Sequence, residues 1–159
     1  MSMSLKVGGM NGLKPGFPPK ESRMNSLNLS QPLDDLRMKK RVFFVDDDLS
    51  ILQLYQDEFL EEGYEVILAR NGKEALTKLR EKSPHIVVMD VCMPEKDGIE
   101  TLNAMLRIDG RIPIILNTAY PQYRDNFMTW GAEAYVLKSS DLTELKQKVR
   151  EILKKRNEK

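Results

Sequence analysis

The segment VFFVDD, residues 42–47, places two neighbouring carboxylates directly after a short, continuously apolar run. A second apolar run, IVVMD at residues 86–90, ends the same way on Asp90. Short apolar runs without alternation are typical of strands that are buried on both faces of a parallel sheet. Because ligands of open parallel sheets bind at the carboxyl ends of the strands, we expect Asp46, Asp47 and Asp90 to meet at an active site there.

Two further apolar runs end on groups that can contact an anion. The run at 112–117 reaches Thr118, and the run at 134–137 reaches Lys138. Three acids, a hydroxyl and an amine could therefore share one edge of the sheet. Carboxylates with this placement can hold Mg²⁺, which prefers oxygen ligands, and can leave one acid as a nucleophile. The residues predict a metal site beside a nucleophile.

Strand and helix patterns alternate along the chain from Arg41 onward. We predict strands at about 41–46, 64–69, 85–90, 112–118 and 133–137. We predict helices at about 49–62, 72–82, 97–108 and 121–130. In the first of these, Leu52, Tyr55 and Phe59 form an apolar stripe. In a last helix, Leu142, Leu145, Val149 and Ile152 share one face. Five strands alternating with five helices imply right-handed crossovers and an α/β fold with a parallel sheet covered on both sides.

The order, types and spacing of these residues resemble the receiver domain of two-component response regulators. The resemblance covers roughly residues 39–155 and rests on five motifs, which are Val45-Asp46-Asp47-Asp48, Met89-Asp90-Val91-Cys92-Met93-Pro94, Asp97-Gly98, Asn117-Thr118-Ala119, and Tyr135 with Lys138. Each motif is common alone, but five in the right order are specific. The resemblance implies a flavodoxin-like fold with the strand order 2-1-3-4-5.

The resemblance also assigns roles to the acids. It implies that Asp90 is the phosphoacceptor and that Mg²⁺ is bound by Asp47, by Asp90 and by the backbone carbonyl of Cys92, while Asp46 holds the ion through water. For Asp48 we expect only a cap on the following helix. Without a metal, acids at one edge repel each other, so the bare cluster should be destabilising.

Other residues would act on the phosphoryl group once it is bound. By resemblance, Lys138 contacts a phosphoryl oxygen, Thr118 donates its hydroxyl, and Tyr135 changes position as Thr118 moves. An ordinary buried strand tyrosine is the alternative for Tyr135. In this family Cys92 and Tyr120 occupy the positions that flank the approach of water, so they would modulate the lifetime of the phosphoryl group.

One position departs from the family pattern. Receivers usually carry a proline with a cis peptide bond after the lysine, but Ser139 follows Lys138 here. The sequence leaves cis or trans open, although a cis bond that does not precede proline costs about 2.5–4 kcal/mol. Ser139 and Ser140 could also cap the last helix.

Composition limits the class of protein and its partners. The 25 Lys and Arg residues nearly balance the 24 Asp and Glu residues, so the chain has no large net charge that would attract nucleic acid or a membrane surface. Cys92 is the only cysteine, and no signal peptide or membrane span is evident, so we expect a cytoplasmic protein. We expect residues 1–37 to be a disordered leader, a cloning remnant or part of a misassigned start, before a receiver domain at 38–157.

The leading hypothesis is a receiver that is phosphorylated on Asp90 and signals through protein contacts. Its partners would be a histidine kinase or a histidine phosphotransfer protein, and a downstream protein target, because the one histidine, His85, is expected to be structural. Any enzymatic activity would be limited to accepting and losing its own phosphoryl group. The alternatives are an interaction module that is not phosphorylated and a Mg²⁺-dependent phosphatase, although the second acid of such a phosphatase is replaced by Cys92.

Overall fold

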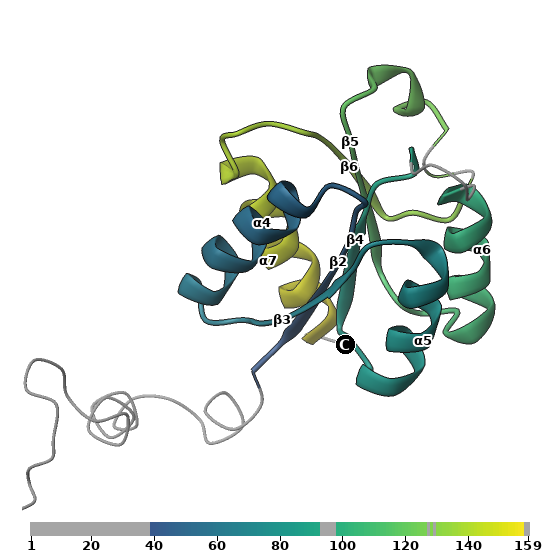
Figure 1. Cartoon of the computed structure of the whole chain (residues 1–159), viewed down its shortest axis with the longest axis horizontal. Coiled ribbons are helices and arrows are strands. Elements are labelled where there is room, and N and C mark those ends of the chain that lie inside the picture. The colour runs from purple at the N-terminus through teal and green to yellow at the C-terminus, as the bar shows by residue number, and fades with distance from the viewer. Residues whose placement is uncertain (1–38, 93–97, 127, 129, 158–159) are drawn as a thin grey trace, which may run out of the picture. The chain divides into compact units, whose positions relative to one another are not determined.

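Five strands alternate with helices in the described part of the chain, which comprises residues 39–92, 98–126, 128 and 130–157 (Figure 1). The structure is a computed structural model. Its strands are β2 (Arg41–Val45), β3 (Glu65–Ala69), β4 (Ile86–Met89), β5 (Ile114–Thr118) and β6 (Ala134–Leu137). Its helices are α4 (Leu49–Glu61), α5 (Gly72–Lys82), α6 (Gly98–Ile108) and α7 (Thr143–Asn157), with a short 3₁₀ helix, η1 (Pro121–Tyr123).

All five strands are parallel, and their order in the sheet is β3-β2-β4-β5-β6. In order along the chain this is 2-1-3-4-5, so the predicted topology is confirmed. Val45 is paired with Met89, and the residues that follow them, Asp46 and Asp90, therefore leave adjacent strands side by side. The amide of Asp90 continues the pairing by donating to the carbonyl oxygen of Val45 at 3.1 Å.

Helices cover both faces of the sheet. Figure 1 shows α4 and α7 on one side and α5 and α6 on the other. Neighbouring residues of β2 enter opposite cores, with Phe44 on the side of α4 and Phe43 on the side of α5. The ring of Phe44 lies 5.0 Å from the ring of Tyr55 and 4.9 Å from that of Phe59, which fixes α4 on the sheet. Burial on both faces explains why the strands are apolar without alternation.

Local signals set the boundaries of α4, the helix that follows the first two acids. Asp48 caps the helix as predicted, and its Oδ1 accepts hydrogen bonds from the amides of Ser50 and Ile51 at 2.9 and 3.3 Å. Gly63 follows the helix with a φ of +95°, a left-handed conformation that glycine adopts without strain. The chain therefore enters and leaves α4 at fixed points.

The described residues of the segment 121–130 do not form the predicted α-helix. The structure has η1 there, followed by hydrogen-bonded turns, in which the amides of Arg124 and Asn126 donate to carbonyl oxygens three residues back. Short polar side chains such as Asp125 and Asn126 favour turns over a continuous helix because they compete for backbone hydrogen bonds. The described residues thus contain four α-helices, not five. None of these four is long and apolar enough to cross a membrane.

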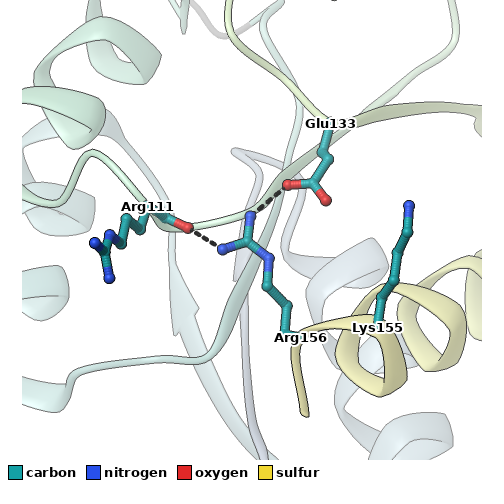
Figure 2. A pocket seen from close by; sticks show the side chains of 4 residues that line it. All are labelled: Arg111, Glu133, Lys155 and Arg156. Carbon is teal, nitrogen blue, oxygen red and sulfur yellow. Dashed lines mark hydrogen bonds and ion pairs between the residues drawn. The ribbon is translucent and has the colours of Figure 1, made fainter. Parts of the chain in front are cut away.

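The amino edge of the sheet, opposite the acids, is tied by an arginine at the end of α7. Arg156 donates to Oε1 of Glu133 and to the carbonyl oxygen of Arg111, both at 2.6 Å (Figure 2). Together with Lys155 these residues line a hollow of about 590 Å³. None of the predicted site residues lines this hollow, and the pairing of Arg156 with Glu133 serves to anchor α7.

His85 has the structural role that was predicted. Its Nδ1 accepts a hydrogen bond from the amide of Arg41 at 2.9 Å, just before β4 begins. Burial lowers the pKa of His85, and the positive charges of Arg41 and Lys40 lower it further. The imidazole is therefore held neutral at the edge of the sheet that lies away from the acids.

Candidate functional site

Three carboxylates meet at the carboxyl edge of the sheet. One oxygen from each of Asp46, Asp47 and Asp90 lies within 4.8 Å of the other two. Asp46 and Asp90 are buried, with 3% and 6% exposure, whereas Asp47 is exposed. The cluster therefore has two acids at its floor and one at its rim, and the prediction that these acids meet is confirmed.

Main-chain amides orient the two buried acids. Oδ1 of Asp46 accepts a hydrogen bond from the amide of Asp48 at 2.9 Å, and Oδ1 of Asp90 accepts one from the amide of Cys92 at 3.0 Å. In each case the chain turns immediately after the strand, and the amide two residues after the acid donates a hydrogen bond to its carboxylate. The second oxygen of each carboxylate, Oδ2, is left for other partners.

Lys138 supplies that partner from the end of β6. Its Nζ lies 2.8 Å from Oδ2 of Asp46 and 2.8 Å from Oδ2 of Asp90. Burial alone would lower the pKa of Lys138, but its hydrogen bonds to the two acids outweigh burial and raise this pKa above the ordinary value. Burial raises the pKa of Asp46, although Lys138 and the amide of Asp48 oppose that effect. Lys138 therefore stays charged and offsets the repulsion between the acids.

The chain after Asp90 is held close to the start of α6. A Cβ at Gly98 would lie 2.4 Å from the Cα and the carbonyl oxygen of Val91, so only glycine fits there. Sγ of Cys92 lies 3.5 Å from the hydroxyl of Tyr123, and the thiol is half-buried. The motif residues Met93, Pro94 and Asp97 lie outside the described part of the chain.

Three further predicted residues lie in β5, in the loop after it and in β6. Thr118 is fully buried, and its Oγ1 accepts a hydrogen bond from the amide of Tyr120 at 3.3 Å. The hydroxyl of half-buried Tyr135 donates to the carbonyl oxygen of Tyr120 at 2.8 Å, and the guanidinium of Arg124 lies 5.4 Å from its ring centre. The ring of Tyr120 is 48% exposed. The structure thus links these residues to one another through the loop after β5.

The loop after Lys138 contains Ser139, where the family pattern has proline. No cis peptide bond occurs among the described residues, so the Lys138–Ser139 bond is trans. Oγ of Ser139 accepts from the amide of Asp141 at 3.0 Å, and Asp141 in turn accepts from the amide of Thr143 at 3.0 Å. The residue that satisfies the first turn of α7 is therefore Asp141, and the suggestion that the serine pair caps this helix is wrong. Serine and aspartate are equally good capping residues, so the sequence does not show which of these neighbours caps the helix.

Sequence reasoning also missed a buried polar pair next to the site. The hydroxyl of Tyr55 donates to Oδ1 of Asn117, and Nδ2 of Asn117 donates to the carbonyl oxygen of Val136 at 3.1 Å. Tyr55 was expected only as part of the apolar face of α4, which it is. The available signal was Asn117, a polar residue inside an otherwise apolar strand.

The donor set fits Mg²⁺. This ion usually takes one or two carboxylates and keeps several waters, and here buried acids face an exposed one at a rim that water can reach. Asp46, Asp47 and Asp90 are the residues that could hold it. The contribution of the Cys92 carbonyl stays a prediction.

Comparisons with known proteins agree with this geometry. A family model described as the response regulator receiver domain matches residues 42–150. Response regulator protein TrrA from Thermotoga maritima, solved in complex with Mg²⁺ and BeF, is 40% identical with a TM-score of 0.66, over 70% of this chain and 97% of that chain. TrrA solved in complex with histidine kinase ThkA is 40% identical with a TM-score of 0.66, over 72% of this chain and 98% of that chain.

Curated relatives include longer proteins. The alkaline phosphatase synthesis transcriptional regulatory protein PhoP of Bacillus subtilis is 34% identical over 120 residues, which are 74% of this chain and 50% of PhoP. The chain spans about half the length of this relative and of several other curated relatives that it matches. The similarity is thus to the receiver part, and with the acid cluster and the topology it shows that this chain belongs to the response regulator receiver family.

Proposed function

We propose that this receiver accepts a phosphoryl group on Asp90 in a Mg²⁺-dependent reaction. The observation that carries the proposal is the position of Asp90. This residue directly follows β4, its carboxylate belongs to the acid cluster, and it contacts Nζ of Lys138 at 2.8 Å. A carboxylate that attacks phosphorus approaches an anionic group, so it needs positive charge and fixed orientation beside it. The turn at Cys92 supplies orientation, and Lys138 supplies positive charge.

Individual residues of the site have different roles in the proposed phosphoryl transfer. A carboxylate oxygen of Asp90 forms the new bond to phosphorus, while the bond to the donor's nitrogen or oxygen breaks and its electron pair leaves with the donor. Lys138 is placed to pair with a phosphoryl oxygen, since it already contacts Asp90. Asp47 and Asp90 would hold Mg²⁺ directly and Asp46 would hold it through water, and the bound ion would neutralise charge on the phosphoryl oxygens.

The natural phosphodonor is proposed to be a phosphohistidine on a separate protein. His85 cannot serve, because its Nδ1 is engaged by the amide of Arg41 at the opposite edge of the sheet. The similarity to TrrA, which was solved with a histidine kinase, supports a kinase or a histidine phosphotransfer protein as the partner. A downstream protein target would read the change at the ends of β5 and β6.

The roles of the surrounding residues remain predictions. The hydroxyl of Thr118 would bind the phosphoryl group, and Tyr135 would respond through the loop that carries its partner, Tyr120. Tyr120 and Cys92 would modulate the lifetime of the phosphoryl group. Their positions around the edge of the site support these roles.

Mass spectrometry after treatment with acetyl phosphate tests the proposal. We expect a single phosphorylated residue in the parent, no modification in Asp90→Asn, and no modification of the parent in EDTA. Asp57→Asn is the matched control, because Asp57 is an exposed acid of α4 outside the cluster, and it should be modified as the parent is. Modification that persists in Asp90→Asn, or a folded parent that is never modified, would contradict the proposal, and the second result would favour an interaction module.

A further inference from the structure

A buried polar pair joins helix α4 to strand β5, near enough to the acid cluster for its charges to act on the pair. Tyr55 and Asn117 are 3% and 2% exposed, and the tyrosine hydroxyl donates to Oδ1 of the asparagine. Nδ2 of Asn117 donates to the carbonyl oxygen of Val136 at 3.1 Å. Both polar side chains are thus satisfied by one chain of hydrogen bonds that runs from α4 through β5 to β6.

Each end of this chain of hydrogen bonds lies next to a residue of the site. Asn117 directly precedes Thr118, and Val136 is separated from Lys138 by one residue. The ends of the two strands are also tied by the amide of Lys138, which donates to the carbonyl oxygen of Thr118 at 2.8 Å. A shift of Asn117 would therefore move both Thr118 and Lys138.

Strand β6 is restrained on one side only, so a hydrogen bond from a side chain of β5 contributes to holding it in place. It lies at the edge of the sheet and pairs only with β5 among the described strands. Leu137, the last residue of the strand, is exposed, and the chain then continues into the loop of Ser139. Among the described residues, the side chain of Asn117 holds β6 by a hydrogen bond at Val136, two residues before Lys138.

The surroundings of Tyr55 keep its hydroxyl protonated, so that it acts as a hydrogen-bond donor near the acids. Burial raises the pKa of Tyr55 to about 12, and the charges of Lys138, Asp46 and Asp90 are near enough to act on it. The hydroxyl therefore remains protonated. An apolar pair would fill the same core without the desolvation cost of polar groups, so packing alone gives no reason for a hydroxyl and an amide here.

We propose that Tyr55 and Asn117 are positioning residues that hold Thr118 and Lys138 in place to receive the phosphoryl group on Asp90. This inference rests on the proposed function of Asp90. Phosphoryl recognition depends on small displacements, because charged groups must meet developing charge at hydrogen-bond distance. The hydrogen bonds of the pair run to β5 and β6, whereas the acids come from β2 and β4. Tyr55→Phe keeps the ring that packs on Phe44 of β2, so this variant should bind Mg²⁺ alone as the parent does.

Three variants test the proposal, with Mg²⁺ and beryllofluoride as the probe. Tyr55→Phe removes only the hydroxyl, and Tyr55→Phe/Asn117→Leu replaces both polar groups by apolar ones. Tyr64→Phe is the matched control, since Tyr64 packs against Phe59 in the same core at the far end of α4. For each, we would measure the free energy of unfolding in urea, Mg²⁺ affinity, and beryllofluoride affinity from the fluorescence of Trp130, the single tryptophan.

We expect Tyr55→Phe to weaken beryllofluoride binding by about two- to tenfold, the range that one neutral hydrogen bond spans, with Mg²⁺ affinity unchanged. The double variant should recover part of the stability, because the asparagine oxygen that Tyr55→Phe leaves unpaired is removed, although the carbonyl oxygen of Val136 loses its donor from Asn117. It should not recover beryllofluoride affinity. Tyr64→Phe should bind the probe as the parent does.

The outcomes separate this inference from the function on which it rests. A parent that responds to beryllofluoride, together with a double variant that responds equally, would show a purely structural pair and overturn the inference alone. A Tyr55→Phe protein that lost stability but kept full probe affinity would overturn it in the same way. A folded parent that binds neither Mg²⁺ nor beryllofluoride would overturn the proposed function, and the positioning role with it.

Discussion

The charge of a single residue, Lys138, balances the acid cluster. Its Nζ contacts Asp46 and Asp90 at 2.8 Å, and its side chain is only 17% exposed. Removal of one partner from a buried ion pair leaves the other charges uncompensated, which costs more than the pair contributes net. The same ammonium would compete with a cation for the oxygens of these two acids. Stability and metal affinity should therefore respond in opposite directions when Lys138 is replaced.

Lys138→Met should lower the free energy of unfolding in EDTA by about 3 kcal/mol, the lower end of the range for broken buried pairs. Its affinity for Mg²⁺ should rise, because the acids lose a competing cation, and Mg²⁺ should then restore part of the stability. Urea unfolding with and without Mg²⁺ measures both effects. Lys146→Met is the control, since Lys146 pairs with Glu58 between α7 and α4, away from the cluster. A Lys138→Met protein with unchanged stability and weaker Mg²⁺ binding would contradict this view.

Single residues also show where reading the sequence succeeds and where it fails. The cap at Asp48 follows from a local rule, because the amides that it accepts from are its neighbours in the chain. The structural role of His85 follows from its place at the start of a strand, away from the acids. The pairing of Tyr55 with Asn117 joins residues that are 62 positions apart. Helical periodicity places Tyr55 in the core correctly, but it says nothing of what a buried hydroxyl will meet.

Among the elements, strands were predicted better than the segment between β5 and β6. Apolar runs bounded by acids and turn residues locate strands directly. Residues 121–130 offer Pro121 as a helix start and Gly131 as a stop, which favours a helix, yet the hydrogen bonds there mostly span three residues. Turn-forming side chains inside the segment outweigh its end signals. The sequence pattern located this segment but predicted an α-helix where its described residues form a 3₁₀ helix and turns.

The loop after β6 is the element in which Ser139 departs from the family pattern. Lys138 already reaches both acids with a trans bond before Ser139, so the contacts of the amine do not require proline. Proline would nevertheless fix φ and narrow the positions open to this loop. Because the acids come from other strands, this restraint should act on the coupling between the site and Tyr135, and leave the metal site unchanged.

Ser139→Pro should therefore leave Mg²⁺ affinity nearly unchanged and enlarge the chemical-shift response of Tyr135 to Mg²⁺ and beryllofluoride. Ser139→Ala is the control, because it removes the hydrogen bond from the amide of Asp141 without restraining the backbone. It should respond as the parent does. NMR spectra of the three proteins measure these responses: equal responses, or loss of Mg²⁺ binding in Ser139→Pro, would show that Ser139 has no role in coupling.

For the molecule as a whole, the fold class follows from the alternation of strands and helices and from the right hand of their crossovers. The order of the strands does not follow from these patterns, since an apolar run does not reveal which strand lies beside it. That order was available only through the resemblance to receivers. Once the order is known, the pairing of Val45 with Met89 brings Asp46 and Asp90 together, so the site is a consequence of topology.

Because the acids belong to both β2 and β4, Mg²⁺ should stabilise the whole domain against unfolding. A ligand that binds only the folded state adds about 2.7 kcal/mol to the free energy of unfolding when its concentration is about 100 times its dissociation constant. Asp47→Asn should abolish this gain and cost little stability in EDTA, because Asp47 is exposed and caps no helix among the described residues.

Asp48→Ala should do the reverse. Loss of the helix cap costs about 1 kcal/mol of stability, but the gain in stability from Mg²⁺ persists. Urea unfolding of both variants with Mg²⁺ and with EDTA separates the two adjacent acids. An Asp47→Asn protein that Mg²⁺ still stabilises fully would remove Asp47 from the metal site, and an Asp48→Ala protein that lost the gain would place Asp48 in it.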